Sequence, residues 1–221
     1  GTSGTFPPFE FVNTQTNEIT GFEMELVRAM GKHLGYDVKM LNIGFDGIIP
    51  AILAGTADVG ASGFSVTEER KKRVLFTAPF YESGLTILVK KADADKIKSF
   101  KDLEGRKVGV QIGTTAIEAL RKMNVDIDLR TYDEVGLVFE DMRNGRLDVV
   151  VCDDPVARYY ASRKEGYKDL MKVAFLTEDV EYIGFVFSKD NAELAAQVNK
   201  GLKAIRENGK EKAIRNKWLG E

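Results

Sequence analysis

The sequence predicts an α/β protein made of two similar lobes. Two stretches of the chain repeat one pattern, in which an apolar-periodic helix ends at a glycine and an Asp-Val pair opens a short apolar strand. The glycine and the aspartate are Gly55 and Asp58 in the first stretch, and Gly145 and Asp148 in the second. Helices and strands alternate along the chain, which favours mostly parallel sheets. Because small ligands bind between such lobes, the repeat indicates a ligand-binding cleft.

The individual elements follow from hydrophobic periodicity and from residues that begin or end helices. Apolar residues at helical spacing predict a helix over 21–34, and Gly35 ends it. Ser99 is a suitable N-cap for a short turn over 100–103, and a long helix over 192–218 is expected to be interrupted near Asn208. The other expected helices cover 46–54, 116–123, 133–143 and 156–164. The expected strands cover 10–12, 38–40, 59–61, 74–76, 85–89, 108–110, 127–131, 148–151 and 182–187.

Composition excludes several classes of function. The 221 residues are 43% hydrophobic and 30% charged, as in ordinary globular proteins. A net charge of −2 with interspersed signs provides no basic surface for nucleic acid, and no apolar run approaches the ~20 residues of a membrane span. One cysteine, Cys152, and one histidine, His33, exclude an intrachain disulfide and a His/Cys metal cluster, so no metal or cofactor is expected. The abrupt start at Gly1 indicates a mature domain without its targeting segment.

The densest group of polar residues follows the first repeated strand, from Ser62, Gly63, Phe64 and Ser65 to Arg70. Small polar residues at the carboxyl end of a strand are where α/β sheets bind ligands. The planar guanidinium of an arginine can grip a carboxylate through two hydrogen bonds. The alternative is that Arg70 is an ordinary surface residue within a charged run.

A second group runs from Gln111 through Gly113 to Thr114 and Thr115, where a strand turns into a helix. Backbone N–H groups and the helix dipole at such a turn attract a small anion. The group lacks the glycine patterns of dinucleotide and phosphate loops, so a carboxylate fits it better than a pyrophosphate. The alternative is that Thr114 simply caps the helix.

A third group, Cys152-Asp153-Asp154-Pro155, ends the second repeated strand. One carboxylate could bind an ammonium group while the other caps the following helix, and the spacing does not decide between them. Both acids could also be solvated. No catalytic residue is expected, because Cys152 has no histidine near it in the sequence and no Ser/His/Asp set can be assembled around His33.

Aromatic residues form the last group. Phe6 and Phe45 fall in loops beside expected strands, which suits walls that sandwich a ligand side chain. The faces of such rings also attract a cationic group.

At these residues the chain resembles the polar amino-acid branch of the bacterial periplasmic solute-binding proteins, which are the receptors of ABC uptake systems. The resemblance runs nearly end to end and depends on the order and spacing of several motifs. They are Phe6-Pro-Pro-Phe-Glu-Phe11, Gly21-Phe-Glu-Met-Glu-Leu26, Phe45-Asp-Gly-Ile-Ile-Pro50, Ser62-Gly-Phe-Ser-Val-Thr-Glu-Glu-Arg70, Phe76-Thr-Ala-Pro-Phe-Tyr81, Lys101-Asp-Leu-Glu-Gly105, 108–115, 148–155 and Lys217-Trp-Leu219.

The resemblance implies a two-lobed periplasmic-binding-protein-like fold of type II, with two parallel-rich sheets flanked by helices and joined by a two-strand hinge. Lobe 1 would comprise residues 1–83 and 184–221, and lobe 2 residues 84–183, with hinge strands near 82–86 and 178–184. It also implies a monomer at the periplasmic or extracellular face of a bacterial membrane, free or lipid-anchored. Its partners would be an amino acid and the permease of an ABC importer.

The resemblance also implies roles for individual residues. Arg70 would grip the α-carboxylate of the ligand, helped by Ser65 and the amides of Thr114 and Thr115. Asp153 would bind the α-ammonium group. The remaining implied contacts are the Gly63 carbonyl and the Ser65 hydroxyl at the ammonium group, Phe6 and Phe45 beside the side chain, Gln111 at its far end, and the neighbouring Ser62, Phe64 and Ser3.

Two departures from the family pattern bear on the ligand. Many relatives that bind glutamine or basic amino acids carry an acidic residue where this chain has Ser3, and Cys152 beside Asp153 is unusual. The stretch from Gln111 to Thr115, by contrast, resembles arginine-binding members. We expect a polar or basic amino acid, with arginine and glutamine leading. The alternatives are the ligand-binding domain of a membrane sensory receptor and an enzyme of cyclohexadienyl dehydratase type, which would need an acid near Ser3.

Overall fold

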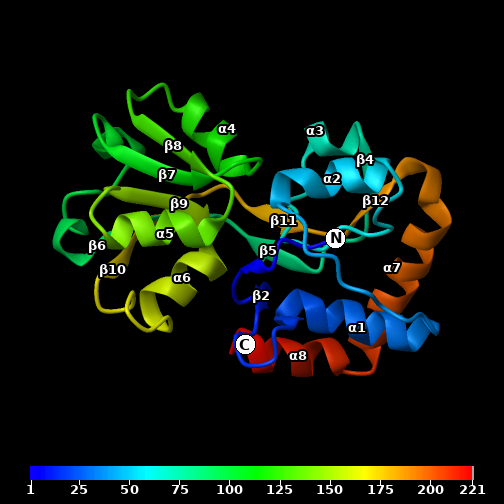
Figure 1. Cartoon of the computed structure of the whole chain (residues 1–221). Coiled ribbons are helices and arrows are strands. Elements are labelled where there is room, and N and C mark those ends of the chain that lie inside the picture. Colours follow the sequence, from blue (N-terminus) through cyan, green and yellow to red (C-terminus); the bar gives the residue numbers. More distant parts are fainter. Residues whose placement is uncertain (221) are drawn as a thin grey trace. The chain divides into compact units, whose positions relative to one another are not determined.

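The computed structural model describes residues 1–220, and the chain divides into two compact units. Unit 1 comprises Gly1–Glu82 and the chain from Tyr182 onward, and unit 2 comprises Ser83–Glu181. The chain passes between the units in two strands, β5 (Tyr81–Ser83) and β11 (Glu181–Ile183), which pair with each other. Helices and strands alternate in both units (Figure 1), so the α/β class that the sequence predicts is confirmed.

Unit 2 is built on a five-stranded sheet of order β10-β6-β9-β7-β8. Strand β7 lies between β8 and β9 and runs parallel to both, whereas β6 runs antiparallel to β9 and β10. The strands are β6 (Leu85–Lys90), β7 (Lys107–Gln111), β8 (Asp128–Tyr132), β9 (Val149–Asp153) and β10 (Met171–Leu176). Because β7 and β9 are parallel neighbours, their last residues, Gln111 and Asp153, end at the same edge of the sheet.

Helices cover this sheet and close the core of unit 2. Helix α5 packs against β7, β8 and β9, and α6 packs against β6, β9 and β10. The Phe139 ring of α5 stacks on the Tyr160 ring of α6, with centroids 3.6 Å apart. The helices of this unit are α4 (Thr115–Lys122), α5 (Val135–Arg143) and α6 (Asp154–Ser162), with the short 3₁₀ turns η1 (Lys91–Asp93) and η2 (Phe100–Leu103).

Unit 1 contains small antiparallel sheets between helices. One sheet joins β1, β2 and β3, and β4 pairs with β12. Helix α1 packs against α7 and α8, while α2 and α7 both pack against β12. The strands are β1 (Thr5–Phe6), β2 (Glu10–Val12), β3 (Ile19–Thr20), β4 (Val74–Phe76) and β12 (Val186–Ser188). The helices are α1 (Phe22–Leu34), α2 (Phe45–Leu53), α3 (Glu68–Lys71), α7 (Ala192–Glu207) and α8 (Lys210–Trp218), with the turn η3 (Lys189–Asn191).

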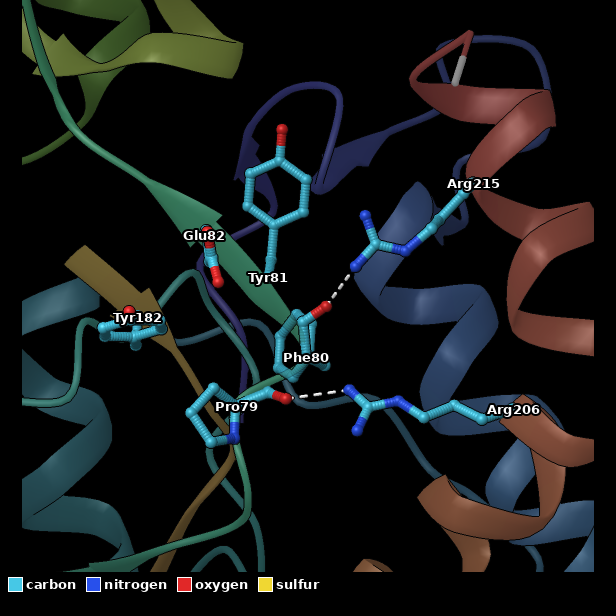
Figure 2. Close-up of a pocket in the computed structure, with 7 residues that line it drawn as sticks. All are labelled: Pro79, Phe80, Tyr81, Glu82, Tyr182, Arg206 and Arg215. Atoms are coloured by element: carbon cyan, nitrogen blue, oxygen red, sulfur yellow. Dashed lines mark hydrogen bonds between the residues drawn. The ribbon is translucent and has the colours of Figure 1, made fainter. Parts of the chain in front are cut away.

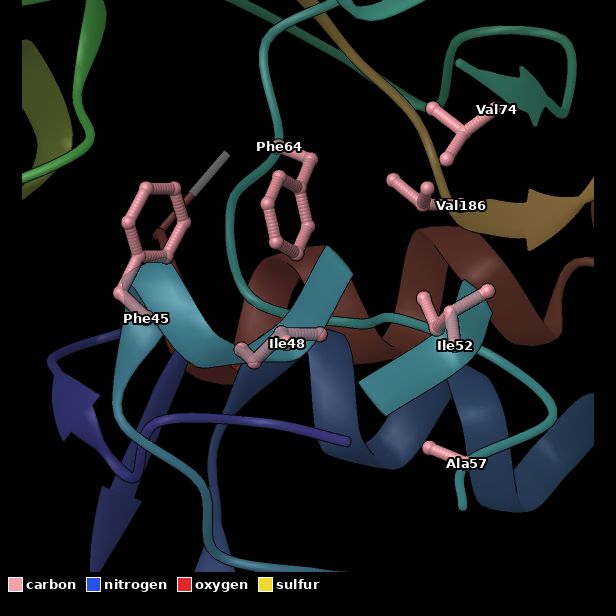
Figure 3. Packing of buried hydrophobic residues seen from close by; sticks show 7 residues of the cluster. All are labelled: Phe45, Ile48, Ile52, Ala57, Phe64, Val74 and Val186. Carbon is pink, nitrogen blue, oxygen red and sulfur yellow. The ribbon is translucent and has the colours of Figure 1, made fainter. Parts of the chain in front are cut away.

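One buried cluster of unit 1 supports the polar residues singled out above. It combines the apolar face of α2 with Phe64 and with side chains from β4 and β12 (Figure 3). Its buried members are Phe45, Ile48, Ile52, Ala57, Phe64, Val74 and Val186. Packing therefore fixes the Phe64 backbone, and with it the chain that continues to Arg70.

The structure corrects the prediction of parallel-rich sheets, because the sheets are mixed in unit 2 and the strand pairs of unit 1 are antiparallel. Strand β6 enters directly from β5 instead of through a helical crossover, so nothing requires it to run parallel to its neighbours. Two predicted strands were also wrong. The half-exposed stretch 38–40 is irregular, and 59–61 contributes only a bridge between Gly60 and Val186.

Three further comparisons show where sequence pattern predicts the ends of helices and strands correctly and where it does not. The interruption of the C-terminal helix is confirmed, since α7 ends at Glu207 and α8 begins at Lys210 after Gly209 at φ 76°. Strand β10 escapes prediction because its register shifts between Val173 and Phe175, which breaks the alternation of side chains. The strand expected over 182–187 is two strands, β11 and β12.

Candidate functional site

In unit 1 the Ser62–Arg70 segment holds its arginine at both ends of the side chain. Thr67 is the N-cap of α3, and its hydroxyl accepts a hydrogen bond from the Arg70 backbone N–H at 3.2 Å. The guanidinium Nη1 of Arg70 donates to the Ser65 carbonyl at 2.8 Å. The first bond fixes the backbone of Arg70, and the second restricts the rotamers of its half-buried side chain, so the guanidinium has a defined direction before any ligand arrives.

Two aromatic rings form the surface on which this guanidinium lies. The rings of Phe45 and Phe64 stack with centroids 4.7 Å apart at 22°, and the Arg70 Cζ lies 5.7 Å and 5.4 Å from their centroids. The ring quadrupoles favour the cation at this distance. They also shield one face of the guanidinium from water, which strengthens its attraction to an anion.

Ser62 and Gly63 are held by hydrogen bonds to two buried glutamates. The Ser62 hydroxyl donates to Glu10 Oε1 at 2.7 Å, and the Gly63 backbone N–H donates to Glu23 Oε2 at 2.8 Å. Gly63 adopts φ +61°, and a Cβ there would lie 2.9 Å from Cε1 of Phe6. Only glycine therefore suits this position, and the Phe6 ring packs directly against its backbone.

Ser3 belongs to the same network. Its backbone N–H donates to the Ser62 oxygen at 3.1 Å, and its hydroxyl accepts from Thr5 at 3.4 Å. The Ser3 side chain is buried, with 6% of the residue exposed. The structure thus brings together Ser3, Phe6, Phe45, Ser62, Gly63, Phe64, Ser65 and Arg70 of the residues that the sequence predicts.

The two acids of this network were missed by sequence reasoning. Glu10 lies on β2 between Phe9 and Phe11, and Glu23 lies in the first turn of α1; both are fully buried. A signal was present for Glu23, because helical spacing places it on the same face as Leu26 and Met30. An acid on the apolar face of a helix requires polar partners inside the protein.

Burial raises the pKa of Glu23 from its ordinary 4.5 to about 7, against the lowering effects of the Gly63 amide and of its hydrogen bond with Glu10. A native pKa above the unfolded one means that the folded protein binds the proton more tightly, so the stability that this binding supports is complete below pH 4.5 and is lost as pH rises through 7. We expect the free energy of unfolding to fall by as much as about 3 kcal/mol across that interval. Urea unfolding at a series of pH values measures it, and Glu23→Gln removes the titrating group. Parallel profiles for the two proteins would contradict the assignment.

In unit 2 the turn between β7 and α4 carries the second predicted group. Gly113 adopts φ 77°, and the Thr114 hydroxyl donates back to the Gln111 carbonyl at 2.8 Å. Thr114 is the N-cap residue of α4, but its side chain makes no capping hydrogen bond. Thr114 therefore stands at the N-cap position, as the alternative predicts, but its hydroxyl does not cap the helix, and the amides at the start of α4 have no side-chain cap from Thr114.

The other polar side chains of this turn contact acceptors within unit 2. The Thr115 hydroxyl donates to Glu181 Oε2 at 3.0 Å, and the Gln111 amide donates to the Asp133 carbonyl at 3.1 Å. Gln111 is buried, with 3% of the residue exposed. Its amide thus orients the loop that follows β8.

The structure separates the two acids that end β9. Asp154 accepts a hydrogen bond from Thr86 at 3.1 Å and pairs with Arg158, whose Nε lies 2.7 Å from Oδ2. Its charge is therefore balanced within α6 and β6. Asp153 is buried at the edge of the sheet where Gln111 also ends, and neither acid caps α6 with its side chain. Asp153 is thus the better candidate for binding a cation.

Neighbouring Cys152 is buried, and this burial raises the pKa of its thiol well above the ordinary value, with the charge of Asp153 adding to the effect. The thiol is therefore protonated at neutral pH, which does not suit a nucleophile. Among residues 1–220, no group of three or more His, Cys, Asp or Glu side chains could hold a metal ion. In the same part of the chain, no helix is both long and apolar enough for a membrane span.

Unit 1 also contains an open pocket of about 590 Å³, whose lining includes none of the candidate residues described above (Figure 2). Arg206 donates to the Pro79 carbonyl at 2.8 Å, and Arg215 donates to the Phe80 carbonyl. Both arginines also pair with Glu211, which is buried. The pocket is lined by Pro79, Phe80, Tyr81, Glu82, Tyr182, Arg206 and Arg215, none of which the sequence singles out as a ligand contact. These arginines tie α7 and α8 to the chain that leads into β5.

Known proteins resemble this chain along its whole length. The family model described as bacterial extracellular solute-binding proteins, family 3, matches residues 1–221. The L-cystine-binding protein TcyJ of Escherichia coli (strain K12) is 32% identical over 220 residues, which cover 100% of this chain and 81% of TcyJ.

Solved structures give the same result. An ancestral arginine-binding protein bound to glutamine matches with a TM-score of 0.94 and 38% identity, covering 100% of this chain and 96% of that one. The ancestral amino acid-binding protein AncCDT-1, a precursor of cyclohexadienyl dehydratase, matches with a TM-score of 0.91 and 39% identity, covering 99% and 93% of the two chains.

Proposed function

Because the chain belongs to family 3 of the bacterial extracellular solute-binding proteins, we propose that it is a receptor that closes around one free polar or basic L-amino acid. The observation that carries the proposal is the Arg70 guanidinium, which Ser65 and two stacked rings hold in a defined direction. A guanidinium so oriented suits bidentate binding of a carboxylate. Every α-amino acid presents that group.

In this proposal the two units supply opposite ends of one site. Unit 1 contributes Arg70 and Ser65 to the α-carboxylate, and unit 2 contributes the amides at Thr114 and Thr115. Asp153 neutralises the α-ammonium group, to which the Gly63 carbonyl and the Ser65 hydroxyl also bind. The walls and rim of the site are formed by Phe6, Phe45, Phe64, Ser62, Ser3 and Gln111. A ligand that needs both units favours the state in which they close on it.

The side chain of the ligand is polar or basic, with arginine and glutamine leading. The relatives support this range, since TcyJ is named for L-cystine and the ancestral protein is an arginine-binding protein bound to glutamine. Ser3 places a hydroxyl network where many relatives place an acid, which favours neutral polar contacts over a strong ion pair.

The receptor acts at the periplasmic or extracellular face of a bacterial membrane, free or lipid-anchored. As a monomer it hands its ligand to the permease of an ABC importer. Family members are extracellular solute-binding proteins, which supports this location. A dehydratase is disfavoured because Glu10 and Glu23, the acids that hydrogen-bond Ser62 and Gly63, are fully buried, where a substrate cannot touch them.

Ligand-dependent thermal unfolding tests the function. The protein is unfolded, dialysed and refolded, and then heated with each of the twenty amino acids, ornithine, citrulline and cystine. A ligand at a thousand times its Kd should stabilise the fold by ~4 kcal/mol, or roughly 8–16 °C in Tm for a chain of this size. We expect that shift with arginine, glutamine or a close analogue. No shift with any compound would overturn the amino-acid proposal.

A further inference from the structure

An acid from β11 is bonded to the turn between β7 and α4. Glu181 is the first residue of β11, and its Oε2 accepts the Thr115 hydroxyl at 3.0 Å. Thr115 is the first residue of α4 and lies 66 positions earlier in the chain. The proposed function assigns the amides of this same turn to the carboxylate of the ligand. Glu181 therefore places a carboxylate of the protein beside a group that a ligand carboxylate would use.

The carboxylate of Glu181 has the charge and the position of a bound anion. The first amides of a helix carry partial positive charge, and the Thr114 side chain does not cap those of α4. A threonine hydroxyl has one proton to donate, and Thr115 donates it to Glu181. While this bond exists, a ligand carboxylate cannot accept that proton. It would also meet a like charge at the start of the helix.

The helix itself does not need this acid. Glu118 lies in the first turn of α4, and Arg121 and Lys122 lie in its last turn. A negative charge at the start of a helix and positive charges at its end interact favourably with the helix dipole. The residues of α4 thus complement its dipole at both ends, so the stability of α4 does not account for a further acid from β11.

The backbone that follows Glu181 is fixed, whereas its side chain has room to turn. In unit 1 the Tyr182 carbonyl accepts the Val66 N–H at 2.7 Å, and the Gly184 N–H donates to the Phe64 carbonyl at 3.1 Å. These bonds hold the chain after Glu181 in place. Glu181 is only half-buried, and a glutamate side chain has several rotatable bonds. Its carboxylate can therefore leave Thr115 for solvent by side-chain rotation, while the backbone bonds stay intact.

We propose that Glu181 binds the start of α4 as an internal anion that the ligand carboxylate displaces. The inference rests on the proposed function and deepens it, since it concerns the same turn. Each ligand must break the bond between Glu181 and Thr115 before its own carboxylate binds there, so Glu181 lowers the affinity for every amino acid. All amino acids share the group with which Glu181 competes. Glu181 therefore sets the strength of binding and leaves the choice of side chain to other residues.

Replacing Glu181 with glutamine tests the proposal, because it removes the charge and keeps the shape. Calorimetric titration with the best ligand of the thermal screen should give a Kd about two- to tenfold lower than that of wild type, the size expected for an anion at a helix start. Without ligand, the Tm of the variant should equal that of wild type or fall below it, since a favourable contact is lost. A merely structural role for Glu181 would instead weaken binding and stability together.

Glu178→Gln is the matched control, because Glu178 is an exposed acid shortly before the same strand and its replacement changes the net charge equally. It should bind like wild type. A ligand analogue with a neutral amide in place of the α-carboxylate should bind Glu181→Gln no more tightly than wild type, since it has no anion to compete. The proposal is overturned if Glu181→Gln binds the amino acid with an unchanged or higher Kd, or if Glu178→Gln tightens binding to the same extent.

A second readout needs no amino acid and separates this inference from the proposed function. Sodium acetate supplies a carboxylate alone, and sodium chloride at equal ionic strength is its reference. The ¹⁵N–¹H resonances of Thr115 and Ala116 should shift at lower acetate concentrations in Glu181→Gln than in wild type.

If no amino acid binds but acetate distinguishes the two proteins in this way, the receptor function fails and the competition stands. If an amino acid binds both proteins equally well, the competition fails and the function stands. If no amino acid binds and acetate acts alike on both proteins, both proposals fail.

Discussion

Replacing Arg70 with alanine is expected to weaken amino-acid binding by about 3–5 kcal/mol, or roughly 10²- to 10⁴-fold in Kd. The reason is that the ligand carboxylate would be buried without its cation, beside the rings of Phe45 and Phe64 that exclude water. Arg70→Lys keeps the charge and loses the two-pronged geometry, so its loss should be smaller but measurable. Calorimetric titration of each variant at one pH measures the effect.

Arg73→Ala is the control, because Arg73 lies in the same charged run but is exposed. It should bind like wild type and unfold at the same temperature. A decarboxylated analogue of the ligand sharpens the test, since it should bind wild type and Arg70→Ala with similarly poor affinity. An Arg70→Ala protein that binds the amino acid within a few-fold of wild type would show that the carboxylate lies elsewhere.

Replacing Asp153 with asparagine is expected to cost about 2–5 kcal/mol of affinity, because the α-ammonium group would lose its buried counter-charge. Asparagine preserves the shape at the end of β9, so the fold should be retained. The variant should also lose the discrimination between the amino acid and its analogue without the α-amino group, and that ratio of Kd values is the measurement. In wild type the ratio should be large.

Asp148→Asn is the matched control for this substitution. Asp148 immediately precedes the same strand at its other end, where it accepts the Lys107 backbone N–H at 2.9 Å. Its replacement should leave the ratio of Kd values unchanged. If the Asp153→Asn protein keeps the wild-type ratio of Kd values, the α-ammonium group is bound by another acid of the site and the assignment of Asp153 is wrong.

The site was only partly predictable from sequence. Arg70 was a candidate because it follows a run of small polar residues, but its spacing left open that it is an ordinary surface residue in a charged run. The tertiary structure adds the two rings that orient it. Spacing alone did not decide between Asp153 and Asp154, and only the resemblance favoured Asp153. The structure adds that Asp154 already has Thr86 and Arg158 as partners. Glu10 and Glu23 were missed because both read as ordinary acids beside aromatic residues.

The fold, like the site, was only partly predictable from sequence. Helix α1 and the break between α7 and α8 are visible in the sequence, since 3.6-residue periodicity and a left-handed glycine are local properties. The direction of β6 against β9 is not local, because it follows from the way the chain enters unit 2 from β5. The expectation of parallel-rich sheets failed at that point.

The sequence by itself determined the α/β class, helix α1 and the residues of the Ser62–Arg70 segment, because each depends on a few neighbouring positions. The strand of the first repeat, 59–61, did not form, since only Gly60 bridges to Val186. Only the tertiary structure decided that Glu23 meets Gly63, forty residues along the chain, and that Glu10 meets Ser62. Burial is a property of the packed molecule, and it is burial that raises the pKa of Glu23 above its ordinary value.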